Sequence, residues 1–192
     1  RHHHLQQHGA FAGGALYRLT PTLNVYASAA CGFETPTLNE LFYSRPGSGR
    51  TSYQNVAQTT RKGVEVVVDS RWAGDFTTRI AYSGLVARYA EPFVTVVLGA
   101  PTLIEAGRYL PGIPGHTLFG ELVWRQPAGG WHAGIEAIAR SKVYVEDSNT
   151  QQAAPAYAIA NLRVGFDQQR GALRYAGFLR LDNIFDRQYA GS

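Results

Sequence analysis

The sequence has little charge, a single cysteine and no long apolar run. Charged residues make up 17% of the 192 residues, and one cysteine, Cys31, allows no internal disulfide. No stretch of about 18 apolar residues occurs, so a transmembrane helix is excluded. A transmembrane β-strand is not excluded, because it needs only about 9–11 residues and turns every second one toward lipid.

A basic patch is also missing. The formal net charge is +4, but Lys and Arg are scattered singly along the chain. A protein that binds nucleic acid usually gathers them on one face, so we predict no nucleic-acid partner. No secretory leader opens the chain, and we therefore expect its N-terminus to be mature or internal.

Motifs for catalysis and for metal binding are absent. The sequence contains no phosphate-binding loop, no nucleophile elbow and no Cys/His zinc spacing. Asp69, Asp75 and Glu91 have no histidine or nucleophile in a recognisable arrangement with them. The N-terminal histidine run at residues 2–4 is more typical of a tag remnant than of metal ligands. We predict no enzyme activity, no metal site and no cofactor.

Period-two alternation is the dominant pattern in the chain. Trp131, Ile135 and Val143 belong to an apolar row, and Glu136 and Arg140 belong to the row that alternates with it. Such a pattern predicts a β-strand with one face in an apolar medium and the other in water. Aromatic residues make up 12% of the chain, and glycine is frequent, which disfavours disorder.

We predict an all-β fold, an antiparallel meander of about eight long strands. The strands are expected over residues 8–19, 22–33, 54–71, 76–90, 115–126, 131–146, 155–167 and 172–184. Most exceed ten residues, whereas strands of soluble proteins usually have about five or six. Tilted transmembrane strands have the greater length, which favours part of a transmembrane β-barrel or a reduced form of one.

The connections between these strands alternate between short and long. The short ones are residues 20–21, 72–75, 127–130 and 168–171, and the long ones are 34–53, 91–114 and 147–154. In a meander, alternate connections lie at opposite ends, so all short turns share one rim, as in outer-membrane barrels. Aromatic residues flank the short turns, and we interpret them as an interfacial girdle rather than as ordinary strand caps. They are Trp72, Phe76, Trp124, Trp131, Phe166 and Tyr175.

Three segments resemble a known family. Residues 32–42 read GFETPTLNELF, residues 54–65 run from Gln-Asn-Val to Gly-Val-Glu, and residues 183–189 read NIFDRQY. Each is similar to a segment of TonB-dependent receptors, and the three occur in the family's order. The resemblance extends from about residue 9 to the end of the chain.

This resemblance implies the C-terminal part of a 22-stranded barrel in the bacterial outer membrane, plugged by an N-terminal domain. Such receptors bind a nutrient, typically a ferric siderophore, and the TonB complex energises its import through the plug. We therefore expect residues 1–192 to be a partial barrel domain without the plug, in contact with outer-membrane lipid. Compared with the family, a hairpin after Phe42 and a last strand are expected to be missing. A small barrel closed from eight strands is an alternative.

Two groups of candidate site residues follow from the predicted topology. Arginine and tyrosine at the long-loop rim suit an anionic ligand, although loop anchoring is an equal alternative. These are Tyr43, Arg45, Tyr89, Arg108 and Tyr109. Charged residues on the polar strand face would line the lumen, and we favour a solvated, internally paired wall over a guiding conduit. These are Arg79, Glu121, Glu136, Arg140, Arg163 and Arg180.

Two other functions remain open at this stage. A passive porin-like or small structural barrel would share the strand pattern but would lack a plug. A soluble β-sandwich that binds carbohydrate or protein would hide its apolar rows between two sheets.

Overall fold

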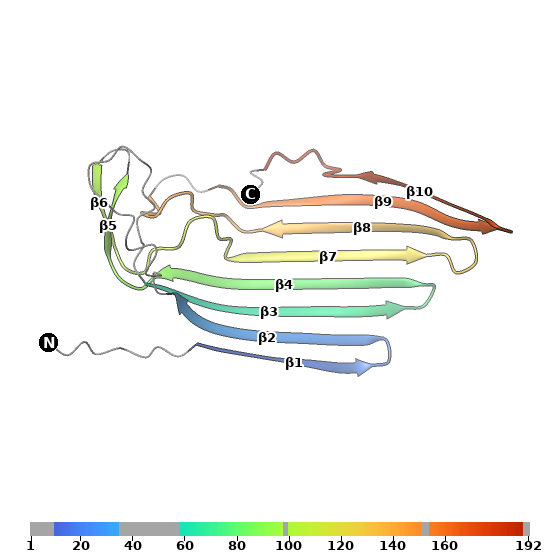
Figure 1. Ribbon diagram of the computed structural model, residues 1–192, viewed down its shortest axis with the longest axis horizontal. Helices are drawn as coiled ribbons and strands as arrows, with labels where there is room; N and C mark the ends of the chain where they lie inside the picture. The colour runs from blue at the N-terminus through green and yellow to red at the C-terminus, as the bar shows by residue number, and fades with distance from the viewer. Residues whose placement is uncertain (1–9, 35–57, 98–99, 151–153, 190–192) are drawn as a thin grey trace.

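The computed structural model describes residues 10–34, 58–97, 100–150 and 154–189, and in these ranges the regular secondary structure is all β (Figure 1). No described segment is a helix long and apolar enough to cross a membrane. The strands are β1 (Phe11–Thr20), β2 (Leu23–Glu34), β3 (Thr59–Trp72), β4 (Phe76–Tyr89), β5 (Phe93–Val97), β6 (Ala100–Ile104), β7 (His116–Arg125), β8 (Trp131–Arg140), β9 (Tyr157–Arg170) and β10 (Leu173–Leu181).

Eight of these strands form one antiparallel sheet in the order β1-β2-β3-β4-β7-β8-β9-β10. The predicted meander is thus confirmed, and the short turns lie together at one end of the sheet, with the long connections at the other (Figure 1). Strands β1 and β10 lie at opposite edges and do not pair. The closed eight-strand alternative is therefore wrong for this structure, which is an open section of barrel wall.

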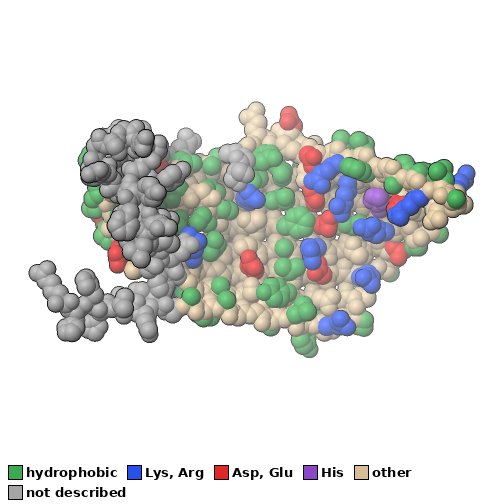
Figure 2. All heavy atoms as spheres, viewed as in Figure 1, with side chains coloured by type: hydrophobic (Ala, Val, Ile, Leu, Met, Phe, Trp, Pro, Cys, Tyr) green, Lys and Arg blue, Asp and Glu red, His purple; other side chains and the backbone are tan. Residues whose placement is uncertain are grey.

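The sheet is a single layer, and its two faces differ in character. The face that carries Asp69, Arg79 and Glu121 is called the charged face, and the opposite one, with Val64 and Ile135, the apolar face. Most of the large exposed apolar side chains lie on the apolar face, including Trp72, Ile80, Leu118, Leu122, Ile135, Leu162 and Leu179. Figure 2 shows charged side chains gathered toward the short-turn end of the sheet.

This arrangement leaves almost no buried core. Only five apolar residues are buried among those described: Ala87, Tyr89, Ile104, Val123 and Ala160. The accessible surface is 14438 Å², against about 9,000 Å² for a compact soluble protein of this mass. No second described sheet covers the apolar rows, so the β-sandwich alternative is wrong.

Aromatic side chains mark the short-turn rim on the apolar face. Trp72 pairs with Phe76 across the β3–β4 turn, and Phe76 in turn lies opposite Trp124. The Trp131 and Phe166 ring centroids are 5.3 Å apart. The predicted girdle residues thus share one face and one rim, at the height where a membrane interface favours Trp and Tyr.

Several strand boundaries differ from the predicted ones. The strand predicted over 131–146 ends at Arg140, because the chain beyond leaves the sheet and Tyr144 stacks on Tyr109. The long connection at 91–114 contains the unpredicted hairpin β5–β6, whose Phe93 packs on Tyr89 at 4.8 Å between ring centroids. The last short turn lies at residues 171–172, because β9 continues to Arg170.

The strand predicted over 172–184 ends at Leu181, and the NIFD segment forms a turn. Asn183 and Asp186 have positive φ angles of 50° and 48°, a conformation that asparagine and aspartate tolerate better than most residues. The Asn183 side chain accepts a hydrogen bond from Arg187 N and donates one to Arg187 O, each at 3.0 Å. Ile184 N then donates to Ala160 O, and Tyr189 stacks on Tyr157. The segment therefore lies along the first residues of β9, beyond the end of β10.

Candidate functional site

A continuous row of polar residues crosses the charged face perpendicular to the strands. The register pairs each member with the next, from strand β1 to strand β9. The members are Arg18, Asn24, Asp69, Arg79, Glu121, Glu136 and Asn161, and we call them the polar row. Because side chains of one row point to the same side, the row places seven polar groups on one wall.

The carboxylates of the row are paired with arginines. Arg79 forms two hydrogen bonds with Asp69, at 2.8 and 3.0 Å, from neighbouring strands. Glu121 and Glu136 lie directly opposite each other on β7 and β8, an arrangement that is unfavourable for two like charges. Arg163 and Arg180 each bind one of the two carboxylates, at 2.6 and 2.5 Å respectively.

Gly134 makes the Arg163 contact possible. Arg163 extends from β9 across β8 to reach Glu121 on β7, and it crosses at Gly134. A Cβ atom at Gly134 would lie 2.9 Å from Arg163 Nε and 3.3 Å from its Cγ. The glycine therefore leaves the space that an arginine needs to bridge two strand spacings.

Asn161 connects the polar row to the turn at residues 183–186. Its side chain donates to Glu136 Oε1 at 2.7 Å and accepts a hydrogen bond from Asn183 N at 2.7 Å. Asn161 is 6% exposed, so both ends of the amide are satisfied within the protein. The NIFD motif and the charged face are thereby held in one network.

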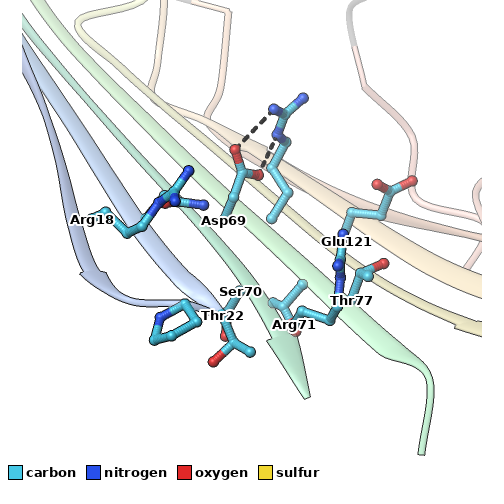
Figure 3. Close-up of a pocket in the computed structure, with 11 residues that line it drawn as sticks. Arg18, Thr22, Asp69, Ser70, Arg71, Thr77 and Glu121 are labelled. Carbon is cyan, nitrogen blue, oxygen red and sulfur yellow. Dashed lines mark hydrogen bonds and ion pairs between the residues drawn. The ribbon is translucent and has the colours of Figure 1, made fainter. Parts of the chain in front are cut away.

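A concavity of about 480 Å³ lies beside the row at the short-turn end (Figure 3). Arg18, Asp69, Arg71, Arg79 and Glu121 contribute charged side chains to its lining. Asp69 forms an ion pair with Arg79, and Glu121 forms one with Arg163. The side chains of Arg18 and Arg71 have no hydrogen bond or ion pair with any residue that the structure describes, so the concavity offers two available guanidinium groups to an anion.

The structure places all six predicted lumen residues on the charged face, but it gathers only five of them. Arg79, Glu121, Glu136, Arg163 and Arg180 lie on or beside the polar row. Arg140 lies four residues from Glu136 along β8, opposite Thr117 and Tyr157, near the long-loop end. The prediction missed Arg18, Asn24, Asp69 and Asn161, which period-two counting within their own strands would have assigned to this face.

Three of the five predicted loop residues, Tyr89, Arg108 and Tyr109, lie at the opposite end of the sheet. Tyr89 is 4% exposed, and its hydroxyl donates to Asp147 at 2.5 Å. The Tyr109 ring contacts the Arg88 guanidinium, 4.4 Å from the ring centroid, and stacks on the Tyr144 ring at 5.6 Å between centroids. Asn149 binds both the N–H and the carbonyl of Tyr109. These contacts fix the connections at 105–114 and 141–150 to each other.

Arg108 differs from its neighbours in this cluster. Its side chain is exposed and has no partner among the described residues, while its carbonyl accepts a hydrogen bond from Tyr89 N at 3.0 Å. A fixed backbone and a free guanidinium suit the binding of an anion. Tyr43 and Arg45 lie outside the described residues.

The charged face supplies arginines, carboxylates and amides, which bind and orient ligands. The described residues contain no group of three or more His, Cys, Asp or Glu side chains that could hold a metal ion. The single layer, the apolar outer face and the girdle define a section of transmembrane β-barrel wall.

A family model described as "TonB dependent receptor-like, beta-barrel" matches residues 44–184. The chain therefore belongs to the TonB-dependent receptor β-barrel family. This family consists of receptors and transporters of the bacterial outer membrane and is not enzymatic. The match confirms the predicted family, location and absence of an enzymatic role.

Solved structures share the fold at low sequence identity. The siderophore receptor PiuA from Acinetobacter baumannii matches with a TM-score of 0.69 and 18% identity, over 94% of this chain and 24% of that one. The ferric yersiniabactin uptake receptor FyuA from Yersinia pestis gives 0.65 and 16%, over 94% and 25%. The ferric citrate transporter FecA gives 0.61 and 15%, over 94% and 34%. The chain thus spans about a quarter to a third of the length of these receptors.

Proposed function

We propose that the chain forms part of an outer-membrane receptor that binds a ferric siderophore or a similar nutrient complex and imports it with energy from the TonB complex. The observation that carries the proposal is the family match over residues 44–184. The energy would reach the ligand through a plug domain outside residues 1–192. The neighbours named above, receptors for siderophores and ferric citrate, support a ferric complex as the ligand class.

The long-loop rim is the proposed place of capture. Arg108 presents an exposed guanidinium there, without a partner among the described residues, and the stacked rings of Tyr109 and Tyr144 belong to the same rim. Ferric complexes with catecholate or carboxylate groups carry negative charge and planar surface, which arginine and tyrosine bind. The polar row, together with Arg18 and Arg71 of the concavity, would form the solvent-exposed wall along which the ligand or a plug lies.

A porin-like barrel is the competing function. It would share the single layer and the two faces, but the family model that matches is one of receptors. A rim fixed by the Tyr89–Asp147 and Asn149–Tyr109 contacts also suits a binding surface, because a fixed surface loses little entropy on binding.

Filter binding tests the proposal with the whole receptor that contains this chain, purified in mild detergent. Radioactive iron is supplied as ferric citrate, as a ferric catecholate and as a ferric hydroxamate. We expect one complex to be retained, and Arg108→Gln to weaken its binding about tenfold, as loss of a charged hydrogen bond predicts. Arg125→Gln, an exposed arginine at the short-turn rim, is the matched control and should bind unchanged. Retention of none of the three complexes, or equal loss in both variants, contradicts the proposal.

A further inference from the structure

The apolar face carries a few basic side chains, and their positions are not random. Within the described strands of the large sheet these are Lys62, Arg88, His116 and Arg170, and no acidic side chain lies on this face. Arg88 is bound to Tyr109. Arg170 stands at the short-turn rim. Lys62 and His116 lie near the long-loop end, on β3 and β7, with β4 between them.

The height of Lys62 matches the outer boundary of a membrane. It lies ten residues from the girdle residue Trp72 on the same strand. At ~3.3 Å per residue this is roughly 33 Å along the strand, or roughly 25 Å of height at a tilt of about 40°. The apolar band of such barrels is about 25 Å tall. Lys62 therefore stands at the level of the lipid headgroups of the outer leaflet.

An apolar groove of about 500 Å³ runs between these two basic residues. Its lining includes Cys31, Val64, Val86 and Gly84, together with Lys62 and His116. Gly84 lies directly opposite His116, and the Tyr82 phenol lies over it, 2.9 Å from where a Cβ atom of Gly84 would be, so Tyr82 forms the floor of the groove beside His116. A groove with apolar walls and basic residues is complementary to a lipid with an anionic head and a hydrocarbon tail.

The two basic groups are arranged to receive an anion. Lys62 is exposed and has no hydrogen bond or ion pair within the described part of the chain. The Tyr82 hydroxyl lies 2.8 Å from His116 Nδ1, and the two rings stack. When Tyr82 donates to Nδ1, the proton of the neutral imidazole is on Nε2, which then becomes a donor. The Cα atoms of Lys62 and His116 are ~12 Å apart by sheet spacing, so one phosphate group fits between the two side chains.

We propose that this groove binds a membrane lipid whose phosphate headgroup has a net negative charge, held between Lys62 and His116, with an acyl chain along Val64 and Val86. The site faces lipid and not the lumen, so it is separate from the proposed capture of a nutrient. It gives the receptor a fixed anionic lipid at the outer boundary, on the strands that lead to the long-loop rim.

Native mass spectrometry of the receptor that contains this chain, in zwitterionic detergent, tests this proposal, with phosphatidylglycerol and phosphatidylcholine added separately. We expect phosphatidylglycerol to be retained preferentially. Lys62→Gln should reduce that retention about fivefold, the factor expected for one basic side chain near an anionic lipid surface. His116→Gln should reduce it as well, and Lys62→Arg should restore it.

Arg170→Gln is the matched control, because it removes a positive charge from the same face at the opposite rim. Equal losses in Lys62→Gln and Arg170→Gln would show general charge attraction and overturn the site. Equal retention of the two lipids would also overturn it, since the site would then not recognise an anionic headgroup. Full competition by inorganic phosphate would overturn it as well, since the acyl chain would then contribute nothing. A chain dimer that keeps the groove occupied without lipid would assign the surface to a second copy instead.

Discussion

The two faces of the sheet achieve their roles by different means. On the apolar face, residues such as Ile135 and Leu162 contribute singly, and any apolar side chain of similar size would serve. On the charged face, Arg163 serves only because Glu121 lies two strands away and Gly134 leaves a path between them. Whether a side chain suits the medium that it faces depends on that position alone. Whether two charges pair depends on the register of the strands that carry them. Substitutions on the two faces should therefore have different consequences.

The largest expected effect is a charge on the apolar face. Ile135 lies four residues from the girdle residue Trp131, near the middle of the apolar band, and is 42% exposed. Ile135→Lys should lower the free energy of unfolding in lipid vesicles by about 2–4 kcal/mol. Ile138→Lys, on the charged face of the same strand, should cost about 1 kcal/mol or less. Urea titration in vesicles measures both, and similar losses would contradict the assignment of the faces.

A smaller effect is expected where the charged face depends on a glycine. Gly134→Val places atoms where Arg163 passes, and should cost about 1–2 kcal/mol by overpacking and by loss of the pair with Glu121. Gly120→Val is the control, because nothing lies within 4 Å of a Cβ at that position on the apolar face. Arg163→Gln should add little when combined with Gly134→Val. Full additivity in the same titration would show that Gly134 and Arg163 act independently.

The smallest effects separate paired arginines by their exposure. Arg163→Gln should cost about 1 kcal/mol, because its side chain and that of Glu121 are only 37% and 24% exposed. Arg174→Gln, at the short-turn end, should not change stability measurably, because the Arg174 side chain is 72% exposed and its pair with Asp167 is screened by solvent. Urea titration at low and at high salt measures the loss of stability in each variant. If the two losses were equal, or changed equally with salt, the distinction between a sheltered and an exposed pair would not hold.

Much of the fold could be predicted from local pattern alone. The alternation of apolar and polar residues assigns each strand its two faces without knowledge of its neighbours. The alternation of short and long connections then fixes the up-and-down order. The hairpin β5–β6 and the end of β8 at Arg140 were missed, because they depend on contacts of Tyr89 and Tyr109 with other parts of the chain.

The segment at residues 183–189 shows how a motif can be placed correctly and its conformation predicted wrongly. Its resemblance to the receptor family was recognised, but it was predicted to continue a strand. Asn183 adopts a positive φ, and its amide binds Arg187 while its own N–H binds Asn161. Asn161 is far away in the sequence, so the pairing that ends β10 is not visible locally.

The candidate site was predicted in composition but not in arrangement. The charged residues of the wall were identified from strand periodicity, yet the polar row from Arg18 to Asn161 exists only because seven strands pair in one register. The loop residues Arg108 and Tyr109 remain predicted ligand contacts, and the burial of Tyr89 against Asp147 shows an anchoring contact that the sequence did not reveal.

By itself, the sequence determined which side chains lie on the apolar face and which lie on the charged face, because that choice follows from a period of two along each strand. Tertiary structure alone decided which charges meet one another. A shift of two residues in the β7–β8 or the β8–β9 pairing would keep every side chain on its face but would separate Glu121 from Arg163. The free energy of placing a side chain in an apolar or an aqueous medium depends on that residue alone. The energy of an ion pair depends on the distance between two segments that are far apart in the chain.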